Sequence, residues 1–180
     1  AAATLIPSAR TQTARRRRRL ATRGTAVAVC AAGGDIVKLF DLEGKVAVIT
    51  GSSRGIGRAI AELYAEAGAR VVVSSRKLDA CEKVVAAIEA RGGSAVAVAC
   101  NIGRKEECEA LVARARAAFG RIDILVCNAA VNPYYGPLTE ISDEAFDKIM
   151  AANIRSNLWL CRLVLPEMAE RKDGAVIVVS

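Results

Sequence analysis

A glycine-rich segment, TGSSRGIG at residues 50–57, has the composition and spacing that phosphate binding requires. Glycines allow a sharp turn and a close approach of the backbone to a bound group, and the first N–H groups of a following helix attract phosphate. The spacing is G-x-x-x-G-x-G, unlike G-x-G-x-x-G or G-x-x-x-x-G-K-[ST]. We interpret the segment as a pyrophosphate-binding turn; the alternative is a tight turn with a purely structural role. The residues predicted to bind are Gly51, Ser53, Arg54, Gly55, Ile56 and Gly57.

The segment SSRK at residues 74–77 ends a second predicted strand, where the ribose of a dinucleotide would lie. Folds that bind NAD place an Asp or Glu there to hold the ribose 2′-hydroxyl, and this segment has neither. A 2′-phosphate would instead meet the cations of Arg76 and Arg54, and Ser75 could donate a hydrogen bond to it. We therefore predict NADP(H) as the cofactor, with Ser75, Arg76 and Lys77 as the residues that bind it here. The alternative is that Arg76 and Lys77 form a solvated pair of charges.

Two amide side chains follow the next two predicted strands, and a third stands inside a predicted helix. Asn101 could hydrogen-bond adenine, whereas Asn128 could contact the cofactor or tie adjacent strand ends together. Asn153 is unfavourable within a helix, where it could open the helix locally and bind water or a main-chain group; the alternative is a polar residue that faces solvent. The residues predicted to bind cofactor at these strand ends are Asn101, Ile102, Asn128, Ala129 and Ala130.

Short apolar runs alternate with amphipathic stretches from residue 45 onward, and this order predicts a doubly wound parallel sheet of the Rossmann type. In the first predicted helix, Ile56, Ile60, Leu63 and Ala67 fall on one face. A Ser142 cap begins the last helix. The five predicted strands are residues 45–50, 70–75, 95–100, 122–128 and 174–180, and the four predicted helices are about 56–67, 78–90, 105–119 and 143–171. Residues 35–180 therefore form one NADP-binding α/β domain in this interpretation.

The composition excludes several kinds of chemistry. The chain has no histidine, which removes imidazole as a metal ligand or general base, and we predict no metal site. Its six cysteines include no C-x-x-C pair, so most are interpreted as small buried apolar residues in a reducing compartment. No apolar run is long enough to cross a membrane.

Residues 1–34 differ sharply in composition from the rest of the chain. They hold seven arginines and no acidic residue, whereas the remainder carries 19 basic and 19 acidic residues. This pattern predicts a transit peptide, cleaved near Cys30 and directing the protein to the chloroplast or, alternatively, to the mitochondrion. A nucleic-acid arm or nuclear signal built on RRRRR is the rival interpretation, and the neutral charge of the remainder disfavours it.

These motifs together resemble the short-chain dehydrogenase/reductase family over residues 40–180. The family pattern T-G-x-x-x-G-x-G is present as TGSSRGIG, and its N-N-A-G motif appears as CNAA, with Cys127 and Ala130 as departures. Asn101 stands where the family usually has an acidic residue. Within the family, VVVSSRK and NAAVNP are similar to NADPH-dependent carbonyl and retinal reductases of the dehydrogenase/reductase member four type.

The resemblance implies reduction of a small carbonyl compound, often in a homotetramer. The neutral charge of residues 35–180 and the lack of a long apolar run predict no nucleic-acid or membrane partner. The resemblance assigns Asn153, in AANIRS, the catalytic role of ordering a water in the proton relay. It also implies a catalytic Ser and a Y-x-x-x-K motif, and Ser180 aligns with the residue before that Ser. None of the three tyrosines has Lys four positions later, so we expect a truncated, poorly stable and inactive chain.

Other functions remain open at the level of sequence. A plastid 3-oxoacyl-carrier-protein reductase of the same family is favoured by the leader and disfavoured by NAAVNPYYG. A catalytically dead NADP-binding module is the second alternative.

Overall fold

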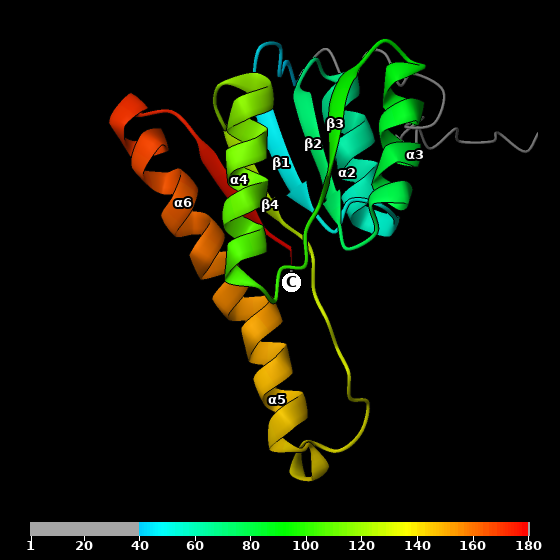
Figure 1. Ribbon diagram of the computed structural model, residues 1–180, viewed down its shortest axis with the longest axis vertical. Coiled ribbons are helices and arrows are strands. Elements are labelled where there is room, and N and C mark those ends of the chain that lie inside the picture. Colours follow the sequence, from blue (N-terminus) through cyan, green and yellow to red (C-terminus); the bar gives the residue numbers. More distant parts are fainter. Residues whose placement is uncertain (1–39, 180) are drawn as a thin grey trace, which may run out of the picture. The chain divides into compact units, whose positions relative to one another are not determined.

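The computed structural model describes residues 40–179, which form a five-stranded parallel sheet with the strand order β3-β2-β1-β4-β5 (Figure 1). This order confirms the predicted doubly wound α/β fold. The predicted transit peptide and Ser180 lie outside the described residues. The strands are β1 (Val46–Thr50), β2 (Arg70–Ser75), β3 (Ser94–Ala99), β4 (Ile124–Cys127) and β5 (Ala175–Val178).

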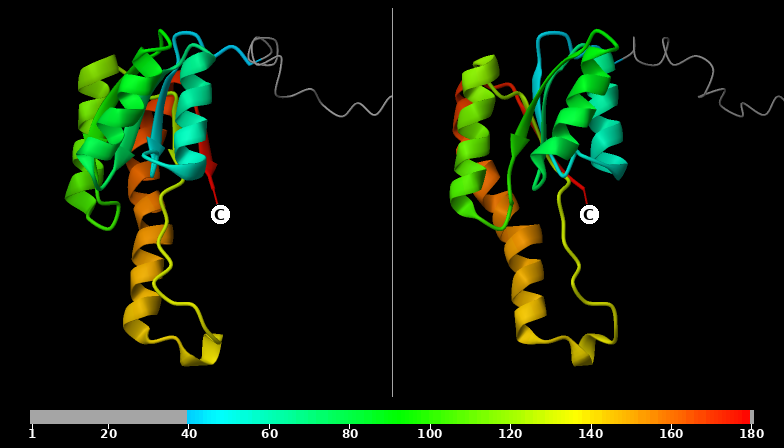
Figure 2. Two further views of the ribbon diagram at one scale, coloured as in Figure 1. Left: turned by 90° about the vertical axis from the view of Figure 1, so that its right-hand side faces the viewer. Right: turned by 45° about the vertical axis from the view of Figure 1, so that its right-hand side comes forward.

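Helices cover both faces of the sheet (Figure 2). Helices α2 (Gly55–Glu66) and α3 (Leu78–Glu89) pack on one face through residues such as Ala61 and Ile88. Helices α4 (Lys105–Phe119) and α6 (Ser156–Arg171) pack on the other through residues such as Leu111 and Leu160. The strand order reverses between β1 and β4, and the C-terminal ends of parallel strands at such a reversal are where ligands bind in this kind of sheet.

Helix α2 packs on the sheet through its smallest residues. Its buried residues are Gly57, Ala61 and Ala65, whereas Ile56 and Leu63 are 65% and 55% exposed. Small side chains let the helix backbone approach the sheet closely, because interiors are packed without gaps. The face that Ile56 and Leu63 mark in the sequence is therefore not the buried face.

The predicted helix over residues 143–171 is a continuous helical path with a change of winding in its middle. It consists of α5 (Asp143–Met150), the π-helical turn η2 (Ala151–Arg155) and α6. Ser142 caps its start, as predicted, by accepting a 3.2 Å hydrogen bond from the backbone N–H of Ala145. A 3₁₀ turn, η1 (Leu138–Glu140), precedes the cap, and this part of the chain extends well beyond the C-terminal ends of the strands (Figure 1).

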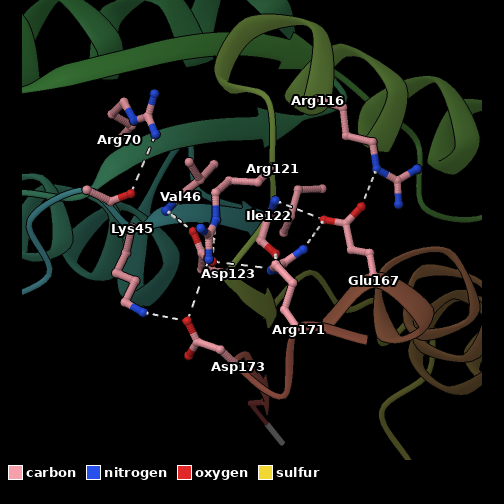
Figure 3. Close-up of polar contacts among 11 residues, drawn as sticks. Lys45, Val46, Arg70, Arg116, Arg121, Ile122, Asp123, Glu167, Arg171 and Asp173 are labelled. Atoms are coloured by element: carbon pink, nitrogen blue, oxygen red, sulfur yellow. Dashed lines mark hydrogen bonds and ion pairs between the residues drawn. The ribbon is translucent and has the colours of Figure 1, made fainter. Parts of the chain in front are cut away.

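A network of ion pairs joins the elements at the opposite, N-terminal edge of the sheet (Figure 3). Asp123, only 1% exposed, accepts hydrogen bonds from the backbone N–H of Val46 at 2.9 Å and from Nε of Arg121 at 2.8 Å. Arg171 of α6 lies 3.5 Å from the same carboxylate and also pairs with Glu167 at 3.2 Å. The buried carboxylate therefore connects the beginnings of β1 and β4 with α6.

The cysteines of the described residues behave largely as predicted. Four are buried and Cys161 is partly buried, all as free thiols, and burial raises the pKa of Cys127 to about 12. Cys30 lies outside the described residues. Among residues 40–179, no helix combines the length and apolar character needed to span a bilayer.

Candidate nucleotide-binding site

The glycine-rich turn leaves β1 at Thr50 and enters α2 at Gly55, at the reversal of strand order. Gly51 and Gly55 have φ values of +66° and +57°, which lie in a region of backbone conformation that residues other than glycine rarely adopt. Gly57 has no room for a side chain, since a Cβ there would lie 2.4 Å from Nδ2 of Asn128 and 2.5 Å from the carbonyl oxygen of Gly51. The turn is therefore closely packed against the end of β4.

Thr50 holds the turn against β4 with a single hydroxyl group. Its Oγ1 donates to the carbonyl of Val126 at 3.2 Å and accepts from the backbone N–H groups of Asn128 and Ala129, each at 3.0 Å. Thr50 is 2% exposed, so these groups have little access to water. Thr50 opens the glycine-rich segment but was not among the residues predicted to bind, although a hydroxyl at the end of a buried strand was a usable signal.

Asn128 ties the ends of β1 and β4 together, which was one of its two predicted roles. Its Nδ2 donates to the carbonyl oxygens of Thr50 at 3.0 Å and Gly51 at 3.2 Å. The amide nitrogen is thus used within the protein, and contact between Asn128 and the cofactor stays a prediction. Ala129 is partly buried and Ala130 is exposed beside it.

The start of α2 is open to an anion. Its N-cap, Arg54, makes no side-chain capping hydrogen bond, and the first turn contains no acidic residue. The first N–H groups of a helix have no partner within the helix and carry partial positive charge. Arg54, Gly55 and Ile56 are exposed and Ser53 is partly buried, so these predicted phosphate-binding residues are accessible at this helix start, whereas Gly57 is buried.

The end of β2 presents two cations to solvent. Arg76 and Lys77 are exposed, and neither forms an ion pair within residues 40–179. The hydroxyl of Ser75 donates to the carbonyl of Lys77 at 3.2 Å and lies 3.2 Å from Sγ of Cys81. Ser75 therefore shapes the turn into α3 in this structure, and its predicted donation to a phosphate stays a prediction.

Asn101 and Ile102 begin the loop between β3 and α4. The Oδ1 atom of Asn101 accepts from the N–H of Gly103 at 3.1 Å, and its own N–H donates to Glu107 at 2.7 Å. Ile102 is 8% exposed and packs in the core that α4 covers. Both lie at the C-terminal edge of the sheet, where adenine was predicted to bind.

Asn153 lies in the π-helical turn and opens the helix, as predicted. Its side chain is hydrogen-bonded twice to the main chain of Val131: Nδ2 donates to the carbonyl at 2.9 Å, and Oδ1 accepts from the N–H at 2.8 Å. The displaced carbonyls of the turn find side-chain partners, since Asn157 donates to the oxygen of Asn153 at 2.8 Å and Ser156 donates to that of Ala152. Such π turns occur often at functional sites.

This geometry agrees with the comparison with known families. The model of the family described as short chain dehydrogenase matches residues 45–180, and the chain belongs to that family. The resemblance inferred from TGSSRGIG and CNAA is thereby confirmed.

Three known proteins show which members of the family the chain is similar to. It is 42% identical to dehydrogenase/reductase SDR family member 4 of the rabbit, Oryctolagus cuniculus, over 83% of this chain and 57% of the relative. A metagenomic short-chain oxidoreductase solved with NADP is 39% identical, with a TM-score of 0.73 over 77% of this chain and 63% of that one. A 7α-hydroxysteroid dehydrogenase solved with NADH and 7-oxo glycochenodeoxycholic acid is 38% identical, with a TM-score of 0.74 over 78% and 54%. The chain spans about half the length of the curated relatives it matches.

Proposed function

We propose that this chain is the nucleotide-binding part of an NADPH-dependent carbonyl reductase. The observation that carries the proposal is the end of β2, which offers Arg76 and Lys77 to solvent and no carboxylate. The two solved relatives were determined with NADP and with NADH, so the choice of nucleotide depends on residues of this chain. A 2′-phosphate near Arg76 gains charge-assisted hydrogen bonds that a ribose hydroxyl lacks.

The residues present fit a dinucleotide. The glycine-rich turn and the open start of α2 would hold the pyrophosphate, and the end of β2 would hold the 2′-phosphate. Asn101 and Ile102 would line the adenine site. When bound, NADPH supplies the hydride that reduces a carbonyl carbon. The carbonyl oxygen then requires a proton, and Asn153 would support its delivery by holding a water near the main chain of Val131.

Replacement of Arg76 tests the nucleotide preference. In Arg76→Asp the new carboxylate repels a 2′-phosphate and accepts from a ribose hydroxyl, so NADPH affinity should fall by about 10- to 100-fold while NADH affinity holds or rises. Dissociation constants for both nucleotides, measured by titration of nucleotide fluorescence, check this. Arg114→Asp is the control, because Arg114 is also exposed but lies on α4. An unchanged ratio of the two constants in Arg76→Asp contradicts the proposed function.

Turnover by the 180-residue chain itself is expected to be absent. The resemblance assigns proton donation to a Tyr followed four residues later by Lys, and Tyr64, Tyr134 and Tyr135 have no such Lys. The chain should therefore bind NADPH without consuming it when an aldehyde or a ketone is added. Loss of NADPH absorbance above the protein-free rate would show that residues within this chain donate the proton.

We also propose that the protein is a homo-oligomer, a tetramer by family resemblance. Four apolar residues at every fourth position along α5, η2 and α6 are exposed, although a soluble helix normally buries such a stripe. They are Phe146, Met150, Ile154 and Leu158. A second copy of the same helix would cover this stripe by two-fold symmetry.

The substrate is proposed only as a class. The 7-oxo group of the bile-acid derivative bound to the solved relative is a ketone, which supports carbonyl compounds in general. The two alternatives from the sequence are kept: a 3-oxoacyl-carrier-protein reductase and a catalytically inactive NADP-binding module. Chloroplast location, with the mitochondrion as alternative, stays a prediction from residues 1–34.

A further inference from the structure

Ser52 is a buried serine in the glycine-rich turn whose hydroxyl faces the protein. Its exposed fraction is 0%, and its Oγ donates to the carbonyl of Ile49 at 2.7 Å and accepts from the N–H of Ser74 at 2.9 Å. Its own N–H donates to the carbonyl of Ser74 at 3.0 Å. Three hydrogen bonds of one residue therefore join the turn to the ends of β1 and β2.

These bonds reach the segment predicted to recognise the 2′-phosphate. Ser74 is 1% exposed and lies two residues before Arg76. On its other side the segment is held by β3, since the carbonyl of Ser75 accepts from the N–H of Cys100 at 2.9 Å. Arg76 thus projects from backbone whose position is set by Ser52 on one side and Cys100 on the other.

A dinucleotide must reach both subsites at once. The pyrophosphate and the 2′-phosphate belong to one molecule, so the distance from the glycine-rich turn to the end of β2 decides whether both are bound well. Sites of this kind lose affinity when supporting residues allow a displacement of about 1 Å. The β1–β2 ladder pairs the two strands as far as Thr50 and Ser74, and the bonds made by Ser52 continue this connection from the strand ends into the glycine-rich turn.

We propose that Ser52 is a positioning residue for nucleotide discrimination: its hydroxyl holds the end of β2 at the spacing from the phosphate-binding turn that lets Arg76 engage a 2′-phosphate. This inference rests on the proposed NADPH preference. Ser52 acts through Ser74 and needs no contact with the nucleotide. Loss of the hydroxyl should therefore weaken binding of the nucleotide that uses the end of β2 more than binding of the one that does not.

The test is a titration of the 180-residue chain with NADPH and with NADH. We expect Ser52→Ala to weaken NADPH binding by about 10-fold and NADH binding by no more than about 3-fold, because an unpaired buried N–H at Ser74 loosens the end of β2. Ser52→Thr keeps the hydroxyl and should keep the ratio of the two constants. Val112→Ala, a core change on the other face of the sheet, should lower the unfolding midpoint without changing the ratio.

If Ser52→Ala does not fold, Ser52→Cys replaces it in the test. The thiol fills a similar space but forms weak hydrogen bonds, so this variant should also reduce the preference for NADPH over NADH. Equal losses for both nucleotides, or an unchanged ratio in both variants, overturn the inference. Arg76→Asp belongs in the same series. If Arg76→Asp changes the ratio and the Ser52 variants do not, the positioning role alone fails; if Arg76→Asp has no effect, the proposed NADPH preference fails.

Discussion

Gly57→Ala should strongly weaken the binding of NADPH and NADH alike. A Cβ at this position would lie 2.4 Å from Nδ2 of Asn128 and 2.5 Å from the carbonyl oxygen of Gly51. Real Cβ atoms do not approach other atoms this closely, so the turn must move away from β4 or the side chain of Asn128 must leave its place. Either movement breaks the bonds from Asn128 to Thr50 and Gly51 that shape the turn.

The expected loss of affinity is about 100-fold or more, with a loss of stability of about 1–3 kcal/mol from overpacking. Nucleotide titration and urea unfolding measure the two effects separately. Gly120→Ala is the control: Gly120 has a φ of +81° and nothing within 4 Å of a Cβ, so its variant carries backbone strain without a collision. It ends α4, far from the glycine-rich turn in the sequence. Near-normal nucleotide binding by Gly57→Ala would show that the turn is not the phosphate site.

Among the substitutions considered, Asp123→Ala should lower the free energy of unfolding most, by about 3 kcal/mol. Asp123 lies at the opposite edge of the sheet from the nucleotide site, so nucleotide contacts are not changed directly. Asp123 is 1% exposed, and its carboxylate forms ion pairs with Arg121 and Arg171 and accepts a hydrogen bond from the N–H of Val46 (Figure 3). Removal leaves the partly buried Arg171 without one of its carboxylates and the N–H of Val46 without an acceptor. Urea unfolding followed by circular dichroism gives the free energy of unfolding.

Asp173→Ala is the matched control in the same network. Asp173 pairs with Lys45 at 2.8 Å, but its side chain is 50% exposed, and exposed ion pairs contribute little. The hydrogen bond from Lys45 lowers the pKa of Asp173, so its small contribution is present above the unfolded pKa and is lost as pH falls through the folded pKa. If the two variants unfold at the same urea concentration, the buried carboxylate is not the centre of the network.

Local patterns in the sequence were sufficient to predict the order of the strands and helices along the chain. Buried strands such as VAVIT and helix signals such as Ser142 are encoded by neighbouring residues, and their observed bounds agree with prediction to within a few residues. The π-helical turn at Asn153 was also anticipated in part, because Asn is unfavourable within a helix. Its partner was not, since Val131 lies 22 residues earlier in a loop without regular pattern.

The buried face of α2 shows why amphipathic patterns can mislead. Ile56 and Leu63 are the larger apolar side chains, yet Gly57, Ala61 and Ala65 face the sheet. The close approach of α2 to the sheet, and of Gly57 to the glycine-rich turn, leaves space for small residues at these positions. Hydrophobicity alone does not encode that distance, which depends on the packing of β1, β4 and the turn together.

The sequence by itself determined the fold class, the glycine-rich turn and the cations at the end of β2, because each of these is a property of contiguous residues. The tertiary structure alone decided the roles of Thr50, Ser52 and Asn128. Thr50 and Asn128 meet across 78 residues, and Ser52 meets Ser74 across 22. A parallel sheet places its adjacent strands far apart in the chain, so the local sequence does not show which partner a side chain at a strand end will meet.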